Sequence, residues 1–85
     1  MYVLEHFDWF GSIEDLDELN NKIKKHWDGK DGVEFVGRFS PHNQKFHWTH
    51  FYKVKDMKAW ANRKVFDWYK RDYKVHTHSV MEYYE

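Results

Sequence analysis

Residues 46–54 read FHWTHFYKV, and this stretch decides the predicted fold because its side chains separate into two alternating sets. One set contains Phe46, Trp48, His50, Tyr52 and Val54, and the other contains His47, Thr49, Phe51 and Lys53. Successive side chains of a β-strand point to opposite faces of its sheet. The stretch is therefore predicted to be a strand with large apolar side chains on both faces. His50 is the ionisable group within the first set.

Three further segments are predicted to be strands, at residues 2–9, 33–40 and 74–84. They are short and rich in apolar and aromatic side chains, as strands usually are. Gly37 interrupts the second of these segments and indicates a bulge or a close approach between backbones. The turn PHNQ (41–44) joins that segment to the opening stretch, so the two form a hairpin.

Two helices are predicted between the strands. Ser12 caps the first helix, because its side chain can accept a hydrogen bond from the amide of Asp15. An apolar stripe follows at spacings of three and four: Ile13, Leu16, Leu19, Ile23 and Trp27. Asp56 caps the second helix. Its inner stripe is Met57, Trp60, Ala61, Lys64, Val65 and Trp68, widened by Phe66, Tyr69 and Tyr73.

The predicted elements follow the order β-α-β-β-α-β within a single domain of residues 1–85. With right-handed crossovers, this order gives a four-stranded antiparallel sheet with both helices on one face, the ferredoxin-like α+β arrangement. The first and third strands are then adjacent and central in the sheet.

The composition favours self-association. Aromatic residues make up 21% of the 85 residues, and each aromatic side chain buries a large area. A chain of this size has a small core, and without cysteine it cannot gain stability from disulfides. Both faces of residues 46–54 are apolar, whereas helices are expected on only one side. We therefore expect a homodimer or higher homo-oligomer that associates through its sheets.

The charge argues against some classes of partner. Fourteen acidic and fourteen basic residues cancel, whereas nucleic-acid-binding proteins usually have a basic surface. The aromatic strand invites comparison with RNA-recognition domains, but the glycines of that motif are missing. Glu5, His6 and Asp8 interrupt the first apolar run, so it is neither a signal peptide nor a spanning helix. We expect a soluble cytoplasmic protein with no nucleic-acid or membrane partner.

The segments MYVLEHF (1–7), GVEFVGRF (32–39) and VMEYYE (80–85) resemble the small dimeric α+β barrel proteins, including short uncharacterised members. The likeness spans the whole chain and implies that two sheets pack face to face into a barrel. Pockets in that superfamily commonly lie between the sheet and the helices of each monomer. Its members include cofactor-independent monooxygenases, isomerases, haem enzymes and proteins with no known activity. No catalytic signature of any one of these groups is present here.

His50 is the main candidate for chemistry, because an imidazole titrates near neutral pH and can shuttle protons or bind a metal. An aromatic cleft with one polar group suits a small apolar ligand. The predicted ligand-binding residues are Phe35, Trp48, His50, Tyr52, Trp60 and Trp68. His50 would act there as a hydrogen-bond partner or as a general base. The alternative is a core histidine bonded to a backbone carbonyl or a tyrosine.

A second candidate site involves the remaining histidines. His76 and His78 are two apart in a predicted strand, so they are expected to share a face. With Glu82 or His6 they could bind zinc or iron; a solvated face is the alternative. His6 could also approach His47 or His50 from the neighbouring strand. Glu5 and Glu34 are candidates for an inward-facing acid, with solvated or interface positions as the alternative.

Three functions remain open from the sequence. The first is an oligomeric barrel that binds a small apolar or aromatic molecule, with monooxygenase or isomerase activity and no expected cofactor. The second is a non-enzymatic assembly protein whose aromatic residues form core and interface. The third is histidine-based binding of a metal or haem. A cavity lined by His50 favours the first function, and a filled core favours the second.

Overall fold

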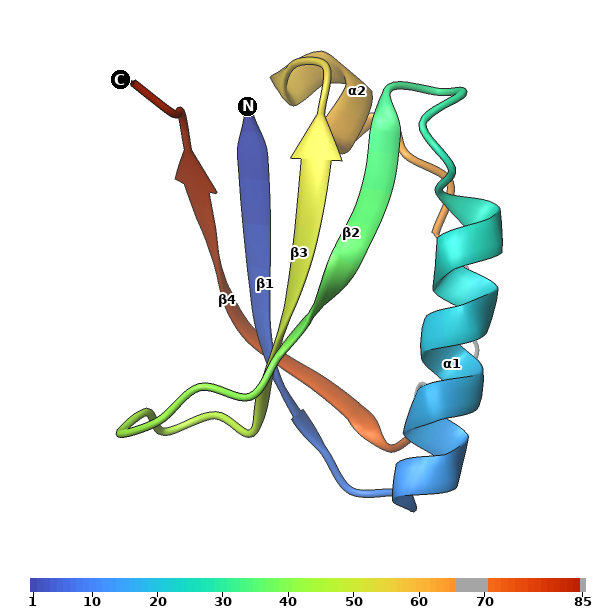
Figure 1. Cartoon of the computed structure of the whole chain (residues 1–85), viewed down its shortest axis with the longest axis vertical. Coiled ribbons are helices and arrows are strands. Elements are labelled where there is room, and N and C mark those ends of the chain that lie inside the picture. Colours follow the sequence, from blue (N-terminus) through green and yellow to red (C-terminus); the bar gives the residue numbers. More distant parts are fainter. Residues whose placement is uncertain (66–70, 85) are drawn as a thin grey trace.

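A four-stranded antiparallel sheet in the order β2-β3-β1-β4 forms the body of the molecule (Figure 1). The computed structural model describes residues 1–65 and 71–84. The strands are β1 (Tyr2–Trp9), β2 (Val33–Phe39), β3 (Trp48–Val54) and β4 (Tyr73–Met81), and the helices are α1 (Ile13–His26) and α2 (Met57–Ala61). The predicted α+β class and the central positions of β1 and β3 are confirmed. The architecture is compatible with a ferredoxin-like arrangement.

Side-chain alternation gives the sheet two different faces. Along β1, Val3, Glu5, Phe7 and Trp9 are buried, and the residues between them are partly exposed. Both helices pack on the side of these buried residues, which we call the helix face. The opposite side, the open face, includes Tyr2, Leu4 and His6 of β1, Thr49, Phe51 and Lys53 of β3, and Phe39 of β2.

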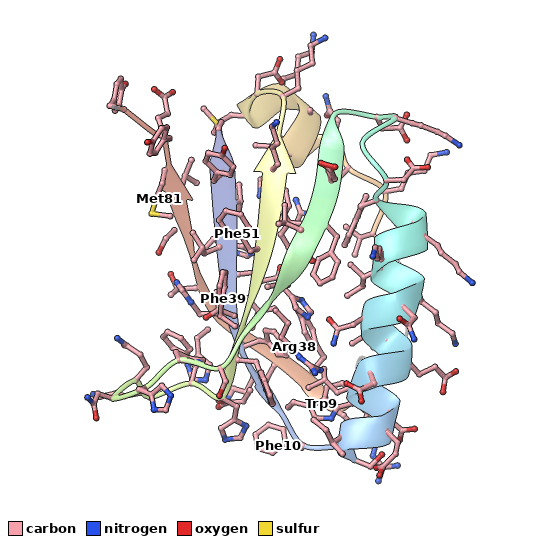
Figure 2. All side chains as sticks on the ribbon, viewed as in Figure 1. Trp9, Phe10, Arg38, Phe39, Phe51 and Met81 are labelled. Atoms are coloured by element: carbon pink, nitrogen blue, oxygen red, sulfur yellow. The ribbon has the colours of Figure 1, made fainter. Side chains whose placement is uncertain are left out.

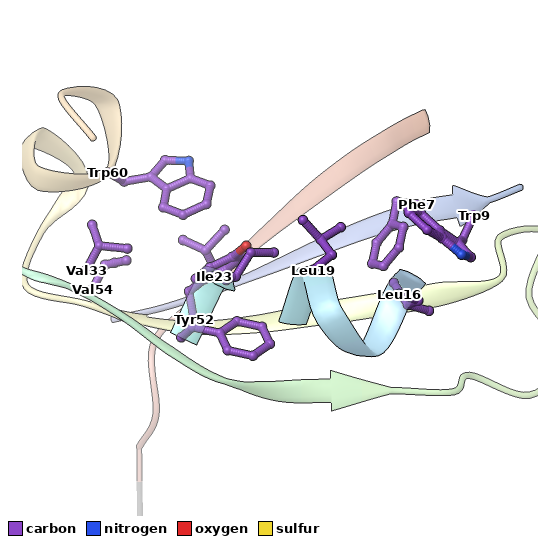
Figure 3. Close-up of a cluster of buried hydrophobic side chains, with 11 residues drawn as sticks. Phe7, Trp9, Leu16, Leu19, Ile23, Val33, Tyr52, Val54 and Trp60 are labelled. Carbon is purple, nitrogen blue, oxygen red and sulfur yellow. The ribbon is translucent and has the colours of Figure 1, made fainter. Parts of the chain in front are cut away.

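The core lies between the helix face and the two helices (Figure 3). Leu16, Leu19 and Ile23 of α1 join Trp60 of α2 in one cluster with the buried apolar residues of β1, β2 and β3. Full burial of such a side chain stabilises the fold by about 1.5–3 kcal/mol. Because one cluster contains residues of both helices, the prediction that they share a face of the sheet is confirmed.

Helix α1 begins and ends as its sequence predicts. The side chain of Ser12 accepts a hydrogen bond from the amide of Asp15 at 3.1 Å. Acidic residues occupy the first turn and basic residues the last, which suits the helix dipole. Ile13 departs from the predicted stripe because it is exposed, whereas Trp27, which directly follows the last helical residue, is partly buried against the core.

Helix α2 is much shorter than predicted. Asp56 caps it as expected, but it ends at Ala61, and Tyr73 is the first residue of β4. The guanidinium of Arg63 donates to the carbonyl of Trp60 at 2.8 Å, and this carbonyl would accept the amide of residue 64 in a longer helix. Val65, predicted to face inward, is exposed. Phe66, Trp68 and Tyr69 lie outside the described residues.

Two bulges interrupt the ladders. Phe35 pairs with Tyr52 and Gly37 with Phe51, so Val36 is an extra residue in β2, next to the predicted glycine. A Cβ at Gly37 would meet nothing within 4 Å, so a close backbone approach does not explain the glycine. In β4, Thr77 pairs with His6 and Val75 with Phe7, which leaves His76 as the extra residue. Such residues change the direction of neighbouring side chains.

None of the helices among the described residues combines the length and the apolar character needed to cross a membrane.

Replacing Trp60 with Ala should lower the free energy of unfolding by about 3–5 kcal/mol, as for other large core truncations. Trp60 is buried, and its ring lies 5.1 Å from that of Tyr52. Chemical denaturation measures the change. Met57, which is exposed in the same helix, is the control, and Met57→Ala should cost only about 0.5 kcal/mol. Equal midpoints for the two variants would contradict the position given to Trp60.

Candidate functional site

A buried carboxylate is the most unusual feature of the helix face. Glu5 lies between Val3 and Phe7 on β1 and is only 8% exposed. Burying an ionised carboxylate is costly unless donors surround it. The two neighbouring strands place a histidine on each side of Glu5, because its register partners are His50 on β3 and His78 on β4.

Glu5, His50, Tyr73 and His78 form a connected set of polar groups, the Glu5 cluster. The Tyr73 hydroxyl donates to Glu5 Oε1, and His78 Nε2 donates to Glu5 Oε2 at 2.8 Å. His50 Nδ1 lies 3.1 Å from the Tyr73 oxygen and 3.7 Å from Glu5 Oε1. Because the hydroxyl proton of Tyr73 points to Glu5, the Tyr73 oxygen accepts from His50 Nδ1. Neutral His50 therefore has its proton on Nδ1 and a lone pair on Nε2.

Burial and these hydrogen bonds set the pKa values of the cluster. Burial alone would raise the pKa of Glu5, but the His50 imidazole beside it and the hydrogen bond from His78, together with the charge of both histidines when protonated, outweigh it and bring the pKa to about 2. Burial lowers the pKa of His50, and the neighbouring carboxylate offsets this only in part. Near neutral pH, Glu5 is therefore ionised and His50 is neutral.

Aromatic rings enclose His50. Its side chain is fully buried, with ring centroids at 4.3 Å for Phe7, 5.2 Å for Phe35 and 5.7 Å for Tyr73. Within the described part of the chain, Nε2 is buried without a hydrogen-bond partner. His50 is thus a core histidine bonded to a tyrosine, and its unpaired atom is the one on which it could act as a base.

Most residues of the predicted aromatic pocket belong to the core cluster or pack against it. Phe35, Tyr52 and Trp60 are buried beside His50 in the core, and Trp48 is partly buried against the same cluster. The rings of Phe35 and Tyr52 are 5.5 Å apart. Trp68 lies outside the described residues. Ligand binding at these residues stays a prediction.

The Glu5 cluster connects the partly exposed His78 to the buried His50 through Glu5 and Tyr73. The side chain of His78 is 32% exposed, whereas His50 is sealed from water. If Nε2 of His50 took a proton, its Nδ1 proton could pass to Tyr73 while the Tyr73 proton passed to Glu5. This arrangement suits a general base that is held in one tautomer by a buried carboxylate.

The residues predicted to bind a metal are not brought together. His6 contacts Thr49 at 2.9 Å and Ser79 at 3.1 Å, and Glu82 accepts from the hydroxyl of Tyr84. Across residues 1–65 and 71–84, no group of three or more His, Asp or Glu side chains is placed to hold a metal ion.

The expectation that His76 and His78 share a face is wrong, because His76 is the bulged residue of β4. His78 contacts Glu5 on the helix face. His76 Nε2 instead lies 2.6 Å from Asp8 Oδ2, and Asp8 is an even-numbered residue of β1 on the open face.

The open face is hollowed in two places. One groove of about 740 Å³ is lined mainly by Tyr2, Val36, Phe51, Met81 and Tyr83. The other, of about 390 Å³, is lined by Leu4, Phe39 and Phe46 and by the polar residues His6, Thr49 and Ser79. Phe46 was predicted to share the face of His50. It precedes β3 instead, and its ring stacks on His6 at 4.3 Å.

Two residues of the Glu5 cluster were underestimated from the sequence. Glu5 was only one of two candidates for an inward acid, and the other candidate, Glu34, is exposed. The useful signal was the alternation of β1, which puts Glu5 on the same face as Val3, Phe7 and Trp9. Tyr73 was assigned to a helix, so its hydroxyl was not considered as a partner.

Comparison with known proteins assigns no family to this chain. It matches no family model, and no curated protein or solved structure is significantly similar to it. The function is therefore inferred from the geometry of this chain.

Replacing Glu5 with Gln should reduce the loss of stability in acid. The pKa of Glu5 in the fold, about 2, is below its ordinary value of 4.5, so the ionised group stabilises the fold above pH 4.5. This contribution, about 3 kcal/mol, is lost as the pH falls from 4.5 toward 2. Denaturation at pH 7 and pH 3 measures it. The exposed Glu14→Gln variant, on α1, should keep the full acid loss, and an equal loss in Glu5→Gln would contradict the assignment.

Proposed function

We propose that this chain acts as a homodimer in which two copies pack the open faces of their sheets together, giving an α+β barrel of ferredoxin-like units. The observation that supports this proposal is the apolar character of the open face. An antiparallel sheet that faces water on one side normally has polar side chains there. Here aromatic and aliphatic side chains extend across all four strands.

Aromatic side chains of the open face contact one another, and several apolar side chains of this face are exposed. The ring of Phe51 lies 5.3 Å from that of Tyr2 and 5.7 Å from that of Phe39. Phe39 is 54% exposed and Met81 is 44% exposed. Figure 2 labels Met81, Phe51 and Phe39, which come from β4, β3 and β2. Contiguous apolar patches of this kind usually mark interaction surfaces.

The total exposed area supports a missing partner. The chain exposes 6146 Å², whereas the scaling for compact monomers gives about 5,500 Å² at this mass. The excess approaches the roughly 800 Å² that each partner contributes to a standard interface.

The charges around the apolar centre suit a second copy of this chain. Glu34 and Lys53 face each other across β2 and β3 and line the rim of the larger groove. In a two-fold interface, residue i of one copy meets residue j of the other, and the reverse contact is also made. Glu34 and Lys53 therefore provide self-complementary charges, with no need for a partner of different charge.

The dimer proposal is tested by sedimentation at micromolar concentration. The wild-type protein should sediment at twice the monomer mass of 10.7 kDa. Phe39→Glu combined with Met81→Glu should give monomers, because facing carboxylates would have to be buried. Ile13→Glu adds a charge at an exposed residue of α1 and should leave the dimer intact. A monomeric wild-type protein, or a dimeric double variant, would falsify the proposal.

A second candidate function is acid–base chemistry on a small apolar or aromatic molecule at the Glu5 cluster. It is supported by the unpartnered Nε2 of His50 among aromatic rings and by the ionised Glu5 that orients the imidazole. No cofactor is needed for proton transfer by such a base.

The His50 ring resonances test this second function by NMR. Burial should make His50 titrate below 6.5. Aromatic compounds that bind beside Nε2 should shift these resonances in the wild-type protein. His50→Phe should abolish binding and cost about 1–3 kcal/mol of stability, because the Tyr73 oxygen loses its donor. Ligand binding that persists in His50→Phe would exclude this role.

A further inference from the structure

A cleft of about 590 Å³ lies between the end of α1 and the segment that contains α2. One wall is residues 26–33 and the other is residues 55–64. The amide of Lys55 donates to the carbonyl of Gly32 at 2.8 Å, and His26 Nε2 lies 2.9 Å from the carbonyl oxygen of Lys64. These contacts hold the walls together, and the volume is typical of small-molecule sites.

Gly32 is what allows the walls to approach. It has a φ of +81°, and a Cβ there would lie 3.1 Å from the Cβ atoms of both Ala59 and Lys55. A larger residue would therefore be strained and would push the walls apart. The distance between the two walls of the cleft therefore depends on a glycine at position 32.

Basic side chains dominate the lining of the cleft. Five of the lining residues are cations, namely Lys30, Lys55, Lys58, Arg63 and Lys64, and two are acids, Asp31 and Asp56. The cleft thus has a net charge of +3, although the whole chain is neutral. Clefts lined by one sign of charge concentrate ligands of the opposite sign.

Most of these cations are available to a ligand. Lys30 pairs with Asp28 at 3.3 Å, but the ion pairs formed within the described segments include none of Lys55, Lys58 and Lys64. Asp56 is committed in part to capping α2, since its carboxylate accepts from the amide of Ala59 at 2.8 Å. Positive charge is therefore in excess where the two walls meet.

Arg63 is held in place before any ligand arrives. Its guanidinium lies over the Trp60 ring, 3.7 Å from the centroid, and one nitrogen donates to the Trp60 carbonyl. A fixed planar guanidinium with donors left over suits the oxygen atoms of a phosphate group. Trp27, Val33 and Ala59 add apolar surface to the same cleft.

We propose that this cleft binds a small phosphorylated molecule. Its phosphate groups would lie among Lys55, Lys58, Arg63 and Lys64, and its apolar or planar part would rest against Trp27. The site is separate from the open face, because its lining residues come from the α1–β2 turn and from the region of α2. It therefore does not depend on the proposed dimer.

The wild-type protein is titrated with inorganic pyrophosphate and with adenosine diphosphate, followed by calorimetry and by ¹⁵N NMR. Both probes should bind saturably and more weakly as salt rises. The diphosphate with its planar base should bind more tightly than pyrophosphate. Amide shifts should concentrate in residues 26–33 and 55–64. Absence of saturable binding up to millimolar concentration, or shifts centred elsewhere, would overturn the proposal.

A charge-matched pair of variants separates the cleft from general electrostatics. Lys58→Glu with Lys64→Glu should weaken binding at least tenfold. Lys45→Glu with Lys74→Glu makes the same change in net charge at exposed residues outside the cleft, and Lys45 lies in the β2–β3 loop at the other end of the sheet (Figure 1). Equal weakening in both pairs would reject a specific site. The Phe39→Glu, Met81→Glu protein should still bind, which keeps this result independent of dimerisation.

Discussion

The ionised carboxylate of Glu5 constrains the centre of this structure. A charge on the helix face is tolerated only where hydrogen-bond donors reach it. His78 and Tyr73 of β4 donate to the carboxylate, and His50 of β3 donates to the oxygen of Tyr73. A shift of β1 by one residue would place Leu4 or His6 there and remove the match. The cluster therefore specifies the register of β1 against both of its partners.

The attachment of β4 depends strongly on this cluster. No residue from Tyr73 to Met81 is buried, so β4 contributes little to the apolar core. Backbone pairing with β1, polar side-chain contacts and the packing of the Tyr73 ring against that of Phe7, at 4.4 Å, hold it in the sheet. Because of the bulge at His76, the two histidines of β4 lie on different faces of the sheet. His78 contacts Glu5 on the helix face, and His76 contacts Asp8 on the open face. Each carboxylate of β1 thus receives an imidazole from β4.

The regular parts of the fold could be predicted because they follow short-range patterns. Alternation in β1 and β3, the stripe Leu16, Leu19 and Ile23, and the caps Ser12 and Asp56 are local features of sequence. The errors arose where one residue changed the pattern. Arg63 takes over a carbonyl and α2 ends, so Val65 and Tyr73 were misread as positions of that helix. Spacing alone predicts that His76 and His78 share a face of the sheet, but the bulge at His76 places them on opposite faces. The Glu5 cluster joins residues up to 73 positions apart, and only the strand order brings them together.

The neutral total charge hides an uneven distribution. The total of zero gives no sign of any charged region. It does not describe the cleft beside α2, where positive charge exceeds negative charge by three. In the proposed dimer the open faces are buried, while this cleft and the Glu5 cluster stay on the helix side of each subunit. Association and ligand binding would then use opposite faces of one sheet. A substitution that abolishes the dimer would therefore still allow ligand binding to be measured in the monomer.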